Sequence, residues 1–261
     1  MNQTLHLALI PFIFCAGLCV GSFLNVVIHR LPLGESVITP RSRCPHCRTA
    51  ITWYQNIPLF SFLFLRGKCA SCHAKISWRY PFVELLTALL FTAAAGTNPT
   101  WYEWPWQFYF LGALVACTFI DLDHWILPDK ITLPGIVIGL AGAALIPSVS
   151  FLNSTIGFLF GGGLLYLVAW AYQLATKKDG LGGGDIKFLA MVGAFLGLEG
   201  AVMTIVIASM VGSVLGIFLM LIKGRKGSSA IPFGPFLSAG AAVAFFFGPA
   251  LWQWYFHLHS S

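Results

Sequence analysis

Two aspartates in distant parts of the chain stand beside long apolar runs, where a carboxyl group is unusual. Asp121 lies in CTFIDLDHWILPDKI and Asp185 lies in GGGDIKF. Ionisable groups in or beside membrane-spanning segments are costly and are therefore functional candidates. If the two carboxyl groups meet, they cannot both ionise easily and will share a proton, as in an aspartic protease. The ionised member would then activate water, and the protonated member would polarise a scissile carbonyl.

A purely structural interpretation of these acids also exists. Glycines before Asp185 let a substrate or a neighbouring helix approach the backbone closely. The start of a helix, however, has free N–H groups that favour an anion, so Asp185 could be only an N-cap residue. Asp129 follows Pro128 and is expected to be an N-cap, and Asp123 is expected to be a solvated loop residue.

Four cysteines form two CxxC pairs, CPHC and CASC, within one polar segment. Two such pairs at this spacing are typical of a zinc ribbon, in which four thiolates surround Zn²⁺ tetrahedrally. A site with four protein ligands has no open position, so we expect a structural metal. His46 and His73 lie inside the pairs and are expected not to be ligands. The predicted ligands are Cys44, Cys47, Cys69 and Cys72.

The composition is that of a membrane protein: 57% of the 261 residues are hydrophobic and 9% are charged. A membrane span takes about 20 mostly apolar residues. The predicted fold is an all-α polytopic membrane protein with about eight transmembrane helices, and Glu199–Gly200 is the expected break between the sixth and seventh. The predicted spans are 6–28, 80–97, 104–121, 131–148, 155–175, 187–198, 200–222 and 232–255.

The positions of the basic residues predict how the chain is oriented. With the N-terminus outside, all fifteen lysines and arginines fall in or at the borders of the inside loops 29–79, 122–130, 176–186 and 223–231. Cytoplasmic loops collect such residues, so the net charge of +6 does not indicate nucleic-acid binding. The N-terminus lacks a basic segment, so we expect no cleaved secretory signal. Asp121 and Asp185 then both lie at the inner face.

Three parts of the chain follow from these patterns. Residues 1–28 are expected to be the first transmembrane helix, and residues 29–79 a small cytoplasmic zinc-ribbon-like loop domain. Residues 80–261 are expected to form the helical domain with the two aspartates. In that domain, Gly157 and Gly161 have the spacing of a close helix–helix contact.

Several stretches resemble one family, in the same order along nearly the whole chain. GGGDIK is similar to the GxGD motif of membrane-embedded aspartic proteases, and IDLDHWILPD (120–129) is similar to the first-aspartate motif of bacterial type IV prepilin peptidases. In that motif the catalytic aspartate precedes the proline by seven residues, which points from Pro128 to Asp121. GSFLNVVIHRLP (21–32), RYPFVELLTALLF (79–91), IPFGPFLSAGA (231–241) and the CxxC pairs also resemble these peptidases.

The resemblance implies a bifunctional enzyme of the bacterial inner membrane. Such enzymes remove the basic leader of type IV prepilins or type II secretion pseudopilins after a glycine, on the cytoplasmic side. They then N-methylate the new terminal residue with S-adenosylmethionine. The resemblance therefore implies that Asp121 and Asp185 are catalytic, that the substrates are helices in the lipid bilayer, and that no nucleic acid is involved.

The methyl-transfer site does not follow from the sequence, because no dinucleotide-binding fingerprint is present. By position, the 29–79 loop and the start of the second span are the candidates. Glu84 could bind the cofactor or the substrate amine, or it could be a buried acid paired with Arg79. Asn25 and Arg30 are further candidates for the same cytoplasmic cavity.

Two other functions fit parts of the pattern. An ion- or solute-transporting protein could use the same acids as a relay, although few polar residues lie at mid-span. A protease of the signal-peptide-peptidase kind would also contain a GxGD motif. That kind usually has a tyrosine before its first aspartate, and here Ile120 precedes Asp121.

Overall fold

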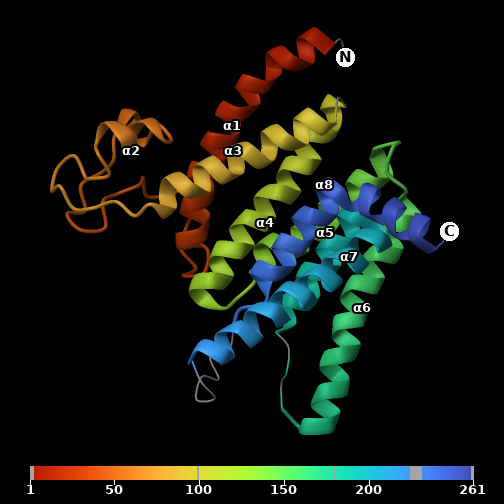
Figure 1. The fold of residues 1–261 in the computed structure, drawn as a ribbon. Helices are drawn as coiled ribbons and strands as arrows, with labels where there is room; N and C mark the ends of the chain where they lie inside the picture. The colour runs from red at the N-terminus through yellow and green to blue at the C-terminus, as the bar shows by residue number, and fades with distance from the viewer. Residues whose placement is uncertain (1–2, 99, 179, 181, 224–230, 260–261) are drawn as a thin grey trace. The chain divides into compact units, whose positions relative to one another are not determined.

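The computed structural model describes residues 3–98, 100–178, 180, 182–223 and 231–259 (Figure 1). Within these residues the fold is helical, with two isolated β-bridges and no strand. The elements in order are α1 (Gln3–Arg30), η1 (Trp53–Asn56), α2 (Phe60–Phe64), α3 (Arg79–Thr97), η2 (Trp101–Glu103), α4 (Trp104–His124), α5 (Asp129–Leu145), α6 (Phe151–Thr176), α7 (Gly183–Lys223) and α8 (Gly234–His259). The predicted fold class is confirmed.

Six helices in the described part of the chain are long and apolar enough to cross a membrane. They cover seven of the eight predicted spans, and the remaining one, 131–148, corresponds to α5. α5 has only 17 residues. α7 joins the sixth and seventh predicted spans across a break. The six segments are His6–Arg30, Arg79–Thr97, Trp101–His124, Phe151–Thr176, Gly183–Ile222 and Gly234–Tyr255.

The break in α7 lies at Gly197, not at the predicted Glu199–Gly200. Gly197 has φ 70° and ψ −171°, a conformation that a residue with a Cβ rarely adopts. The Asn153 side chain of α6 lies against it and accepts a hydrogen bond from the Leu198 N–H at 3.1 Å. The backbone N–H of Leu198 therefore has a hydrogen-bond partner even though the helix is interrupted there.

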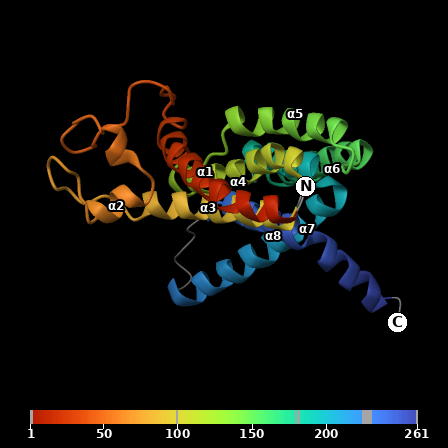
Figure 2. The same ribbon diagram turned by 90° about the horizontal axis from the view of Figure 1, so that it is seen from above.

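The chain divides into two compact units, Met1–Ala116 and Cys117–Ser261. In the first unit, α1 and α3 lie side by side, and the segment carrying α2 extends past their ends (Figures 1 and 2). Small residues set this contact: a Cβ on Gly17 would be 2.6 Å from Ala88 Cα, and one on Gly21 would be 2.6 Å from Glu84 Cα. Glycine at both positions lets the helix backbones touch.

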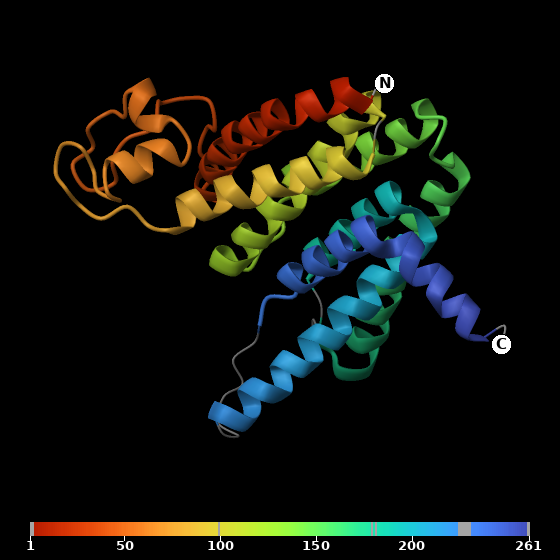
Figure 3. The same cartoon turned by 45° about the horizontal axis from the view of Figure 1, so that its top comes forward.

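In the second unit, α7 contacts α5, α6 and α8 (Figure 3). α7 approaches α6 closely, since a Cβ on Gly161 would be 2.5 Å from the Leu189 carbonyl oxygen. Gly157 meets the backbone of α7 in the same way, which confirms the predicted close contact. Of the predicted inside loops, residues 179, 181 and 224–230 lie outside the described residues.

Candidate active site

Asp121 lies in the last turn of α4 and is buried, with 6% of its surface exposed. The helix ends there because Trp125 adopts φ 58°. The Asp121 Oδ2 atom accepts a hydrogen bond of 2.8 Å from the backbone N–H of Gly234, the first residue of α8. The start of a helix has free N–H groups and a partial positive charge, so it stabilises an anion.

Gly234 is a glycine because of this contact. A Cβ at this position would be 2.6 Å from Asp121 Oδ2 and 3.1 Å from Leu127 Cδ2. Any other residue would have to displace the carboxylate or the start of α8.

Asp185 lies in the first turn of α7, which begins at Gly183, and its side chain is half-buried. The N-cap interpretation is therefore wrong, because Asp185 is already inside the helix. Its Oδ2 atom is 3.3 Å from where a Cβ on Gly182 would be, so this carboxylate folds back over the preceding glycines. A Cβ on Gly184 would be 2.9 Å from Leu127 Cβ. The glycines thus make room for the carboxylate on one side and for the 125–128 segment on the other.

The structure brings Asp121 and Asp185 together around Leu127. Leu127 lies against both Gly234, which binds Asp121, and Gly184, which precedes Asp185. Two acids that are distant in sequence thus form one site in the second unit, although their catalytic role stays a prediction.

An ion pair lies next to this site, and it replaces the N-cap role that was expected of Asp129. Asp129 is the first residue of α5, and its N-cap is Pro128, so Asp129 is not the cap. Instead, its carboxylate accepts two hydrogen bonds from Lys187 Nζ, at 2.7 and 2.8 Å. Asp129 is two residues after Leu127, and Lys187 is two residues after Asp185. The pair therefore ties α5 to the start of α7 beside the two aspartates.

The four predicted zinc ligands form one cluster in the first unit. Their sulfurs all lie within 4.8 Å of one another, and the cluster includes neither histidine. The distance from Cys44 Sγ to Cys72 Sγ is 3.8 Å, and that from Cys47 Sγ to Cys69 Sγ is 4.0 Å. Thiolates about 2.3 Å from a zinc ion lie about 3.8 Å apart in a tetrahedron, whereas a disulfide needs about 2.05 Å. The donors fit a tetrahedral zinc ion.

The two CxxC pairs fold into the same local structure. Cys44 N donates to Thr49 O, and Cys69 N donates to Ala74 O, each closing a tight turn. The left-handed residue in each turn is Arg48, with φ 57°, and His73, with φ 56°. Repetition of one turn on both sides of the cluster is typical of zinc knuckles.

The thiols of the cluster differ in acidity. Hydrogen bonds with the side chain and the backbone of Thr49 lower the pKa of Cys47 to about 6. Backbone hydrogen bonds from Cys72 and Ser71 lower the pKa of Cys69. The thiolates that a zinc ion requires are therefore favoured at two of the four positions before any cation binds.

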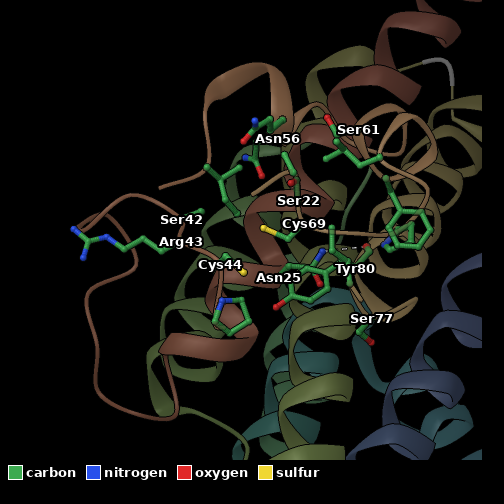
Figure 4. A pocket seen from close by; sticks show the side chains of 18 of the residues that line it. Ser22, Asn25, Ser42, Arg43, Cys44, Asn56, Ser61, Cys69, Ser77 and Tyr80 are labelled. Carbon is green, nitrogen blue, oxygen red and sulfur yellow. Dashed lines mark hydrogen bonds between the residues drawn. The ribbon is translucent and has the colours of Figure 1, made fainter. Parts of the chain in front are cut away.

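Glu84 lies in α3 and is buried, with 8% of its surface exposed. Its Oε2 atom accepts a hydrogen bond of 2.9 Å from the backbone N–H of Leu59, and its carboxyl also bonds to the Ser22 side chain. Asn25 is also buried and donates to the Tyr80 carbonyl at 3.1 Å. These residues line a cavity of about 470 Å³ in the first unit (Figure 4).

Sequence reasoning missed the backbone donors of both carboxylates, Gly234 for Asp121 and Leu59 for Glu84. Nearly every residue has a backbone N–H, so the residue types do not reveal which of them binds a carboxylate. The only indication in the sequence was indirect. PFGP at 232–235 places a glycine at the start of a predicted span. That glycine is the donor.

Two family models match the chain. The Bacterial Peptidase A24 N-terminal domain matches residues 15–97, and the Type IV leader peptidase family matches residues 108–217. The prepilin leader peptidase/N-methyltransferase of Aeromonas hydrophila is 41% identical over 267 residues, which cover 93% of this chain and 92% of that relative. The protein of the same name from Pseudomonas aeruginosa is 37% identical, covering 94% of each. No solved structure matched the chain.

Proposed function

Because this chain belongs to the prepilin leader peptidase/N-methyltransferase family, an enzyme family of multi-pass membrane proteins, we propose that Asp121 and Asp185 are the catalytic pair of its peptidase activity. The substrates are prepilins or type II secretion pseudopilins, cut after a glycine at the end of a basic leader. The observation that supports the proposal is that Leu127 lies against both Gly234, which binds Asp121, and Gly184, which precedes Asp185.

The arrangement suits acid–base hydrolysis of a peptide bond. The two carboxyl groups hold one proton between them, and that proton belongs to the pair rather than to either residue. The Gly234 N–H fixes one oxygen of Asp121, which leaves its other oxygen to orient and deprotonate a water molecule. The protonated carboxyl polarises the scissile carbonyl and later returns its proton to the leaving amine.

The location proposed for this chemistry is the cytoplasmic face of the bacterial inner membrane. It is supported by the basic residues, which gather in the loops predicted to be inside. A leader that is itself basic stays on this side of the membrane, so the cutting residues must be there as well.

Zn²⁺ is proposed as a structural ion of the 29–79 loop domain, held by the four cysteines. It closes a segment too small to build its own core. S-adenosylmethionine is the proposed methyl donor, because the relatives carry N-methyltransferase in their names. It supplies a methyl group on a sulfonium, and Glu84 is proposed to take part in its site.

The test is an incubation of the purified enzyme with a prepilin, with and without S-adenosylmethionine. Mass spectrometry of the product should show the leader removed in both reactions and one methyl group added only with the donor. An intact prepilin in both reactions would overturn the proposed function.

A further inference from the structure

The cavity in the first unit has the size of a small-molecule site. It measures about 470 Å³, and pockets that hold such ligands measure about 300–1,000 Å³. Its walls come from the facing ends of α1 and α3 and from the loop between them (Figure 4). Apolar and aromatic side chains, including Phe62 and Tyr80, line it together with about as many polar and charged ones.

The buried acid gives this cavity a charge preference. Glu84 lines it, and its carboxyl is held by two neutral groups, the Leu59 N–H and the Ser22 side chain. A buried carboxylate is costly unless a cation or hydrogen bonds compensate it. A cationic group of a ligand in this cavity would supply the charge compensation that the two neutral donors do not.

Basic side chains line other parts of the cavity, so its wall carries both negative and positive charges. Arg30, Arg43 and Lys75 line the same cavity. Arg30 Nη1 donates to the Ser36 carbonyl at 3.0 Å, which orders this part of the wall. A ligand with a cation, a carboxylate and a flat ring finds an acid, several bases and aromatic faces here.

A second hollow in the same loop provides a comparison. It measures about 420 Å³ and is lined by Phe62, Arg66, Lys68 and Trp78 among others, with no acidic or amide side chain. It offers no carboxylate to a cationic ligand. The acid of the first cavity is what distinguishes the two.

We infer that the first cavity is the S-adenosylmethionine site, and that Glu84 is its contact for the sulfonium of that ligand. The inference rests on the proposed function, since it locates the cofactor of the second activity. It also assigns methylation to residues of the first unit, whereas the peptidase acids belong to the second unit.

The zinc cluster is part of the same structure. Cys44 and Cys69 line the cavity, and Leu59, whose N–H holds Glu84, lies between the two knuckles in sequence. Without zinc, the two knuckles are no longer held together, and the part of the cavity wall that they form loses its fixed position. Zinc removal should therefore weaken cofactor binding.

The experiment measures binding rather than turnover. Full-length protein in detergent is dialysed to equilibrium against labelled S-adenosylmethionine. Glu84→Gln keeps an oxygen for the Leu59 N–H but removes the charge, so it should fold and should bind the ligand at least tenfold more weakly. Glu35→Gln is the matched control: it makes the same chemical change in an exposed loop residue that does not line the cavity.

Leader cleavage measured in the same preparations separates the two proposals. The expected result is normal cleavage in both variants with weakened binding in Glu84→Gln alone. Wild-type affinity in Glu84→Gln would overturn the inference and leave the peptidase proposal standing. A wild-type protein that binds the ligand but never cleaves would overturn the peptidase proposal instead. Photolabelling with an azido analogue of the cofactor must mark residues 22–84, and labels confined to residues 117–261 would also overturn the inference.

Discussion

Gly234→Ala tests whether the Asp121 contact matters for catalysis. The new Cβ would be 2.6 Å from Asp121 Oδ2, whereas ordinary contacts begin at 3.4 Å, so the two groups must separate by roughly 0.8 Å. Misplacing a catalytic group by about 1 Å can cost about 100-fold in rate, which is about 2.7 kcal/mol of barrier. We expect kcat/KM for leader cleavage to fall roughly 100-fold, as measured with a purified prepilin over a range of concentrations.

The control for this substitution is Gly163→Ala in α6. A Cβ at Gly163 meets nothing within 4 Å, so the same chemical change should leave cleavage unaltered. Thermal unfolding of both variants checks that the loss is local, since overpacking typically costs about 1–3 kcal/mol. Cleavage by Gly234→Ala within twofold of the wild type, in a folded protein, would refute this account of Asp121.

Three further outcomes are expected. Asp129→Asn and Lys187→Met should show a coupling of about 0.2–1 kcal/mol in a double-mutant cycle on cleavage, because an exposed ion pair is weak; strict additivity would mean that the pair does not hold the site. Cys69→Ser should lower the zinc content of purified protein measured by mass spectrometry, and zinc equal to the wild type's would exclude this cluster. The depressed pKa of Cys47 means that its thiolate stabilises the metal-free fold fully above the ordinary cysteine pKa, and that this contribution is lost as the pH falls through about 6. Bound zinc opposes protonation of its ligands, so zinc should be retained at pH 7 and released at a pH lower than about 6; full retention at pH 4 would contradict the assignment.

Composition and motif spacing were enough to predict most of the fold. Long apolar runs determine helices in a membrane, since each backbone group must be paired within its own segment. The break in α7 was misplaced by two residues because it depends on a positive φ at Gly197 and on the Asn153 side chain 44 residues earlier. No local pattern at Glu199–Gly200 conveys that contact.

The site was predictable to the extent that residue type determines chemistry. Paired cysteines specify a metal site, and acids beside apolar runs mark Asp121 and Asp185. Contacts that join distant segments were not predictable. Asp129 looked like an N-cap because its partner Lys187 is 58 residues away, and Glu84 gave no sign of the Leu59 N–H.

Cleavage of a purified prepilin by the wild type, Asp121→Asn and Asp185→Asn tests the central claim most directly, because asparagine keeps each side chain's shape and removes its acid. The account predicts complete leader removal by the wild type and none by either variant, with both variants inserted in the membrane and still binding S-adenosylmethionine. Leader removal by either variant at a rate near that of the wild type would contradict it.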